Sequence, residues 1–78
     1  MKHENPEERL QLILHELKRR FEQACRERDL CRKEHEEENA RLWHNTAHDY
    51  AHMLRVGFDL IPEWNAETKT ANYRVKGA

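Results

Sequence analysis

The chain has 78 residues, 37% of them charged and 37% apolar, and its 14 basic and 15 acidic side chains leave a formal net charge of −1. A chain of this length forms one domain at most. One thin helical chain cannot wall an active-site pocket of about 300–1,000 Å³, so we expect no enzyme and no cofactor. The near-neutral charge argues against a basic nucleic-acid binder, whose pI exceeds about 9, and against disorder caused by self-repulsion.

The N-terminal residues predict neither export nor membrane insertion. No cationic start precedes an apolar run, and the apolar cluster at residues 10–14 is interrupted by Gln11. A membrane span needs about 20 mostly apolar residues in succession. We therefore expect a cytoplasmic protein with no membrane partner.

One long helical stretch dominates the chain. Asn5, Pro6 and Glu8 are typical of a helix start, with an N-cap, a proline at the first helical position and an acid three residues after the cap. No Gly or Pro occurs between Glu7 and Val56, and most residues of this stretch are strong helix formers. An unbroken helix of this length would reach about 75 Å, so it must pack against another copy, another protein or itself.

The first half of this stretch carries an amphipathic stripe. Its large apolar residues recur at steps of three and four positions, and the stripe continues through Ala24 and Cys25. A single helix cannot bury such a stripe, so we expect it to mediate self-association, most simply as a homodimer. The residues expected to self-associate are Leu10, Ile13, Leu14, Leu17 and Phe21.

A second apolar stripe follows a charged segment at residues 26–41. It runs from Trp43 to Ile61 and is rotated by about 100° from the first stripe, so the two do not form one straight seam. Two architectures satisfy this change of phase. One is a continuous, kinked helix, which the absence of Gly and Pro favours; the other is a helical hairpin broken near Glu38–Asn39 or Asn45–Thr46. In either case we expect an all-α chain that oligomerisation completes into a coiled-coil-like bundle.

The C-terminal part lacks helical periodicity. Gly57 suits the position just after a helix end, and Pro62 pushes Ile61 toward extended geometry, so the helix should end by residue 60. We expect an irregular, extended or flexible tail after it. The chain is thus divided into an N-terminal cap at 1–5, two helical halves at 6–38 and 39–60, and the tail at 61–78.

Three histidines form a ridge on the second helical half. His44, His48 and His52 are spaced four residues apart and project along one side of the helix. Two histidines at this spacing can bind zinc. However, no third ligand is fixed by spacing, and Arg41 and Arg55 flank the ridge, so we assign no metal site. A pH-responsive interface is an alternative, because imidazoles gain charge between about pH 5 and 7.

The two cysteines are not expected to pair with each other. Six residues separate Cys25 from Cys31, which in one helix means about 9 Å of rise and about 240° of rotation. A disulfide needs Cα atoms within about 7 Å. We expect two reduced thiols that pack as small apolar residues.

The aromatic residues of the second stripe and the tail indicate how the chain acts. Aromatic anchors usually dominate the energy of protein interfaces, so we expect a non-enzymatic helical module that acts as a regulator, inhibitor or adaptor on a larger protein. Two alternatives stay open: a His-ridge bundle that responds to metal or pH, and a nucleic-acid-associated helical protein. The residues expected to bind the partner are Trp43, Tyr50, Leu54, Phe58 and Trp64.

Overall fold

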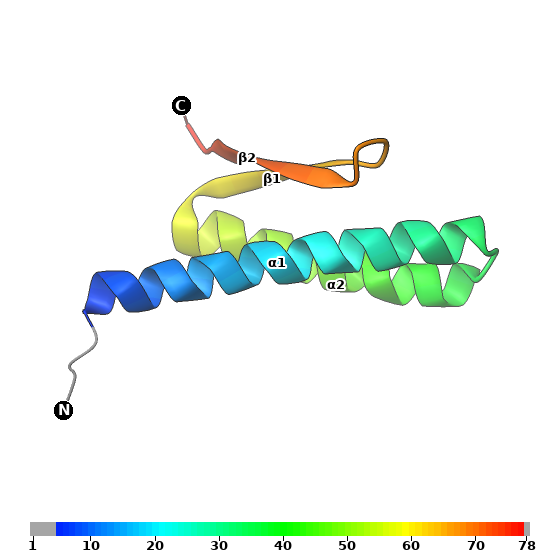
Figure 1. The fold of residues 1–78 in the computed structure, drawn as a ribbon, viewed down its shortest axis with the longest axis horizontal. Coiled ribbons are helices and arrows are strands. Elements are labelled where there is room, and N and C mark those ends of the chain that lie inside the picture. Colours follow the sequence, from blue (N-terminus) through cyan, green and yellow to red (C-terminus); the bar gives the residue numbers. More distant parts are fainter. Residues whose placement is uncertain (1–4, 78) are drawn as a thin grey trace.

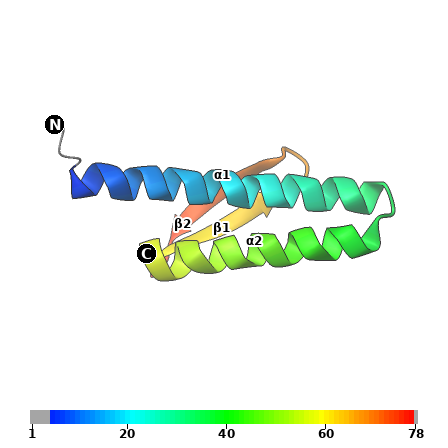
Figure 2. The ribbon, with the colours of Figure 1, turned by 90° about the horizontal axis from the view of Figure 1, so that it is seen from below.

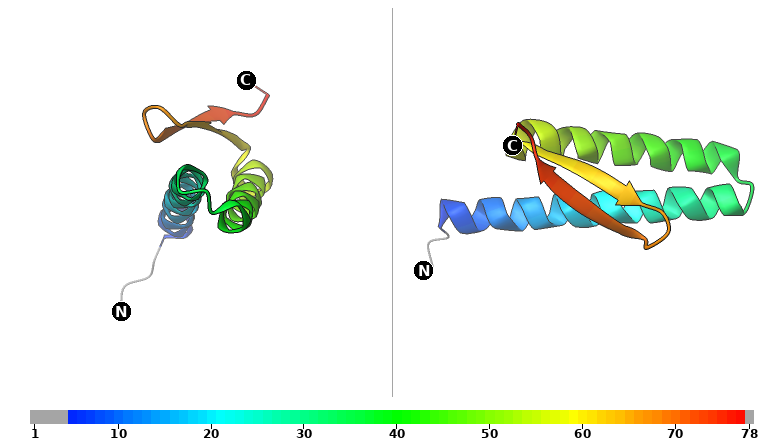
Figure 3. Two further views of the ribbon diagram at one scale, coloured as in Figure 1. Left: turned by 90° about the vertical axis from the view of Figure 1, so that its right-hand side faces the viewer. Right: turned by 90° about the horizontal axis from the view of Figure 1, so that it is seen from above.

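The computed structural model describes residues 5–77 and shows a mostly helical chain with one small antiparallel sheet. Helices α1 (Pro6–Lys33) and α2 (Glu37–Phe58) run side by side in opposite directions (Figure 1). Strands β1 (Leu60–Asn65) and β2 (Thr70–Val75) form a β-hairpin that lies over one face of the helical pair (Figure 3). The helical hairpin, rather than the favoured continuous helix, is therefore the correct architecture.

The start of α1 is the one predicted from the sequence. The Asn5 backbone is extended, and its side-chain oxygen accepts a hydrogen bond of 2.9 Å from the Glu7 amide. Pro6 occupies the first helical position, where a missing amide hydrogen costs nothing. Glu7 and Glu8 place negative charge in the first turn, which the helix dipole favours. Of the predicted cap at 1–5, residues 1–4 lie outside the described part of the chain.

The chain reverses direction at Glu34–Glu36, earlier than either break predicted from the sequence. The His35 amide donates to the Arg32 carbonyl (3.2 Å) and the Glu36 amide to the Cys31 carbonyl (2.8 Å). These two bonds form a Schellman motif around His35, whose φ of 61° is left-handed. Glycine usually occupies this position because it has no Cβ. Because a histidine occupies this position, the sequence contains no glycine that would predict the turn.

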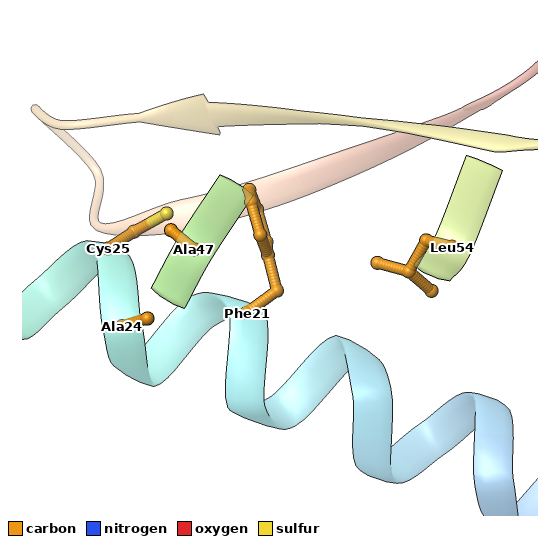
Figure 4. Close-up of a cluster of buried hydrophobic side chains, with 5 residues drawn as sticks. All are labelled: Phe21, Ala24, Cys25, Ala47 and Leu54. Carbon is orange, nitrogen blue, oxygen red and sulfur yellow. The ribbon is translucent and has the colours of Figure 1, made fainter. Parts of the chain in front are cut away.

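Small residues at seven-residue intervals form the contact between the two helices. Ala24 and Cys31 on α1, and Ala40 and Ala47 on α2, are between 1% and 7% exposed. Side chains seven positions apart lie on one stripe of a helix, and small ones allow two helices to approach closely. Away from the turn this small-residue seam leads to larger residues. Figure 4 shows Ala24 and Ala47 of the seam together with the buried side chains of Phe21, Cys25 and Leu54.

The predicted irregular tail is instead a β-hairpin. Its register pairs Leu60 with Val75 and Asn65 with Thr70. The Asn65 side-chain oxygen accepts from the amides of Glu67 (2.9 Å) and Thr68 (3.2 Å) and so closes the connecting turn. The turn contains neither Asn-Gly nor Asp-Gly, the strongest hairpin signals in a sequence, which is why periodicity alone reads this segment as irregular.

The end of α2 also differs from the prediction. Gly57 lies inside the helix, and the left-handed residue that ends it is Asp59, with a φ of 54°. Aspartate tolerates this conformation better than most residues that carry a Cβ. The Asp59 carbonyl then accepts a hydrogen bond of 2.7 Å from the Lys76 amide. This bond ties the helix end to the last residues of the β-hairpin.

We predict that His35→Gly stabilises the protein. Glycine removes the steric penalty of the left-handed conformation, and part of this gain is lost to the greater freedom of the unfolded chain, which leaves about 0.5–1 kcal/mol. His15→Gly is the matched control, because His15 is exposed within α1 and the same change there should cost about 1 kcal/mol. Urea denaturation measures the change in the free energy of unfolding for both variants, which should be an increase for His35→Gly and a decrease for His15→Gly. A decrease for both would contradict the turn described above.

A second prediction concerns the small-residue seam. Ala47→Leu should lower the free energy of unfolding by about 1–3 kcal/mol, because a larger side chain forces the two helices apart. The neighbouring exposed residue provides the control: His48→Leu should change stability by no more than about 0.5 kcal/mol. Urea denaturation followed by circular dichroism measures both, and a neutral Ala47→Leu would show that the helices do not depend on close contact.

Candidate functional site

Two aromatic residues hold the β-hairpin on one face of the helical pair. The Trp64 indole nitrogen donates to Asp29 at 2.8 Å, and the Tyr73 hydroxyl donates to Glu22 at 2.6 Å. The Tyr73 ring also meets the Phe21 ring edge to face, with 6.5 Å between centroids. Burial and the bond to Glu22 raise the pKa of Tyr73, so its hydroxyl stays protonated and can donate. This face of the helices is therefore closed by the chain itself.

The β-hairpin does not cover the other face of the helical pair. Two adjoining hollows of about 280 and 300 Å³ lie there and share Arg20 and Tyr50. No strand residue lines either hollow. Lys18 on α1 faces the β-hairpin, because its ammonium lies over the Tyr73 ring. Gln23, which lines one of the hollows, is turned by about 140° from Lys18 around the helix axis at 100° per residue, so it faces away from the β-hairpin. We call this surface the open face; its lining residues are Ile13, Glu16, Leu17, Arg19, Arg20, Gln23, Trp43, Thr46 and Tyr50.

Charged side chains of both signs lie at the edge of the open face. Glu16 accepts hydrogen bonds from Arg19 (2.7 Å) and from Arg20 (2.8 Å). These two bonds lower the pKa of the Glu16 carboxyl to about 2. Arg20 in turn reaches across to α2, where its guanidinium donates to the Tyr50 hydroxyl at 3.3 Å. The bonds to Tyr50 and Glu16 raise the pKa of Arg20 further, so the edge carries a fixed positive and a fixed negative charge side by side.

The residues predicted to self-associate divide into three environments. Leu10 and Ile13 are 55% and 51% exposed; the first part of α1 extends past the end of α2 (Figure 2). Leu14 and Leu17 are half-buried against the chain's own core. Phe21 is only 6% exposed and belongs to that core. Phe21 is thus unavailable to a partner, whereas Leu10 and Ile13 are exposed and Leu17 is partly exposed.

The residues predicted to bind a partner are also divided. Trp43 and Tyr50 line the open face and stay half-exposed. Leu54 is completely buried, so it packs within the chain and does not present its side chain to a partner. Phe58 is half-buried at the end of α2, and Trp64 belongs to β1, with its indole nitrogen bonded to Asp29 on α1.

The structure brings together residues that the sequence places in two separate sets. Ile13 and Leu17 from the first stripe line the open face together with Trp43 and Tyr50 from the second. This meeting requires the hairpin turn, which periodicity does not reveal. Sequence reasoning missed Arg20, although its four-residue spacing from Glu16 is the signal that would have shown it.

The histidines and cysteines within residues 5–77 do not gather into a metal-binding cluster. His44, His48 and His52 are all exposed, and within residues 5–77 no three His, Cys, Asp or Glu side chains converge on a point that could hold a metal ion. Burial raises the pKa of the thiols of Cys25 and Cys31. Both therefore remain protonated near neutral pH, and a protonated thiol is a poor nucleophile.

Comparisons with known proteins give no relative from which a role could be transferred. No family model, no curated protein and no solved structure matches the chain. In the part of the chain that the structure describes, no helix has the length and apolar character needed to cross a membrane.

The bonds from Arg19 and Arg20 predict an unusually low pKa for the Glu16 carboxyl at the open face. The Glu16 carboxyl should titrate near pH 2, well below the ordinary value near 4.5, as followed by carboxyl carbon NMR shifts. Because the folded pKa is lowered, the stabilisation it gives is complete above about pH 4.5 and disappears as the pH falls toward 2. Arg20→Gln, or 1 M salt, should raise the midpoint toward the ordinary value. A midpoint already near 4.5 in the parent protein would contradict the ion pairs of Glu16 with Arg19 and Arg20.

Proposed function

We propose that this chain is a non-enzymatic helical interaction module that forms a homodimer through its open face and serves a larger protein as a regulator or adaptor. One observation carries the proposal. The β-hairpin covers one face of the helical pair, while Ile13, Leu17, Trp43 and Tyr50 remain partly exposed together on the other. Aromatic and aliphatic side chains gathered in this way are typical of the centre of an interface.

The small core supports the need for a second chain. Of the seven apolar residues buried within 5–77, five are alanine or cysteine. Leu54 is the largest completely buried side chain. A domain of this size buries only about 60% of its unfolded surface and is marginal by itself. A second hairpin packed on the open face would bury its aromatic residues and complete a four-helix bundle.

The charges of the open face favour a second copy as the occupant. A two-fold interface brings the same surface from both chains together, so it must be complementary to itself. Glu16 and the Arg19–Arg20 pair lie side by side at the edge of this face. In a two-fold dimer the carboxylate of each chain can therefore lie near the guanidinium groups of the other. An acidic or a basic partner would repel one half of the same edge.

The outer side of α2 is the surface that we assign to the larger partner. Leu42, Met53 and Val56 are 61%, 47% and 71% exposed, and at 100° per residue they lie within about 60° of one another on the helix. None of them lines the open face. A dimer would display this outer stripe twice, as expected of an adaptor or regulator that engages a symmetric or repeated target.

The dimer is tested by a substitution on the open face. Ile13→Asp should reduce the mass in light scattering from twice the 9.5 kDa chain mass to that of one chain. A charge in place of a buried side chain should raise the dimer dissociation constant by about 100-fold or more. Ile13 is half-exposed in the single chain, so the helical circular dichroism signal should persist.

Leu12→Asp is the matched control. Leu12 is 66% exposed, is adjacent to Ile13 in the chain and lines neither hollow of the open face. This variant should remain dimeric. A parent protein that is monomeric at 100 micromolar in light scattering would contradict the proposal, and so would equal dissociation by the two variants.

A further inference from the structure

A separate cavity of about 370 Å³ lies beneath the loop of the β-hairpin. The hairpin crosses α1 obliquely, and its loop reaches past the outer side of that helix (Figure 3). The cavity is formed where this loop overhangs α1. We call it the loop cavity; its lining residues are Arg26, Glu27, Asp29, Leu30, Lys33, Trp64, Ala66 and Lys69.

Part of the wall of the loop cavity is apolar. Leu30 is 48% exposed although it faces this cavity, so the chain itself does not cover it. The Trp64 ring lines the same space, and its nitrogen already donates to Asp29 at 2.8 Å. An indole has only one polar hydrogen to donate. Trp64 therefore offers a ligand an aromatic surface held in a fixed orientation.

The charged part of the wall is predominantly positive. Both oxygens of Asp29 are occupied, one by Trp64 and the other by the Arg28 guanidinium at 3.0 Å. Among residues 5–77 no ion pair or side-chain hydrogen bond involves Arg26, Lys33 or Lys69. These three cations face one unpaired acid of the lining, Glu27. The cavity thus has positive charge available for a ligand.

The loop that carries Lys69 is ordered by its own hydrogen bonds. The Lys69 amide donates to the Asn65 carbonyl at 2.9 Å, and Lys69 has a left-handed φ of 57°. The hydroxyl groups of Thr68 and Thr70 are joined at 2.7 Å. A loop already fixed in this way loses little conformational entropy when a ligand binds.

From this arrangement we propose that the loop cavity binds a small planar aromatic anion. The aromatic part lies against Leu30 and Trp64, and the anionic group lies near Lys33 and Lys69. The volume is at the lower end of the range of about 300–1,000 Å³ seen for small-molecule sites, which suits one or two fused rings. The loop cavity shares no residue with the open face, so this site does not depend on the proposed dimer.

The test compares two probes of the same shape and different charge. Naphthalene-2-carboxylate, titrated into the full chain at 150 mM salt, should cause saturable NMR shifts of the Leu30 and Lys69 amides and of the Trp64 indole signal. The neutral naphthalene-2-carboxamide should bind about fivefold more weakly, because each exposed charge pair contributes up to about 1 kcal/mol, which is about fivefold in affinity.

Two lysine variants and one control locate the anion. Lys33→Gln and Lys69→Gln should each weaken the binding of the carboxylate by about two- to fivefold. Lys76→Gln should leave it unchanged, because Lys76 is exposed on the β-hairpin and does not line the cavity. All three residues are exposed, so these changes should not unfold the protein.

Several outcomes would overturn the proposal. The first is a titration without saturation, or one whose shifts fall on open-face residues such as Trp43. The second is equal binding of the carboxylate and the carboxamide. The third is equal affinity of the two lysine variants and the parent. Inorganic phosphate that binds as tightly as the carboxylate would show that the apolar wall contributes nothing, and would overturn the aromatic part of the assignment.

Discussion

The close contact between α1 and α2 is the constraint on which the rest of this structure depends. Along the part of the contact nearest the turn, the buried side chains are small: Ala24 and Cys31 on one helix, and Ala40 and Ala47 on the other. Helices joined by so short a turn must run close together from the residues next to the turn onward. Where the four small residues face one another, the helices are too close for an aromatic ring to lie between them.

The two tryptophans and the two tyrosines therefore lie on the outside of the helical pair. On one face the β-hairpin brings Trp64 and Tyr73 onto α1, and polar bonds to Asp29 and Glu22 fix them there. On the other face Trp43 and Tyr50 remain partly exposed. The same physical limit thus produces a closed face, which stabilises the chain, and an open face, which is available to another chain.

The sequence predicted the helical parts and the start of α1 well, because these depend on local interactions. The cap at Asn5 and the long run without Gly or Pro each act within a few residues of the chain. The turn at His35 was not predicted, because its left-handed residue carries a side chain that rarely adopts this conformation. The hairpin loop ends with Lys69 in the same unusual conformation, and it escaped prediction for the same reason.

The sequence by itself determined that the chain is helical, that it carries two apolar stripes and that these stripes are out of phase. Only the tertiary structure decided which residues of each stripe are used within the chain and which are left over. It buries Phe21 and Leu54 and leaves Ile13 beside Tyr50 on one surface. The physical reason is that periodicity reports the face of a helix on which a residue lies, whereas the partner of that face depends on where the chain turns.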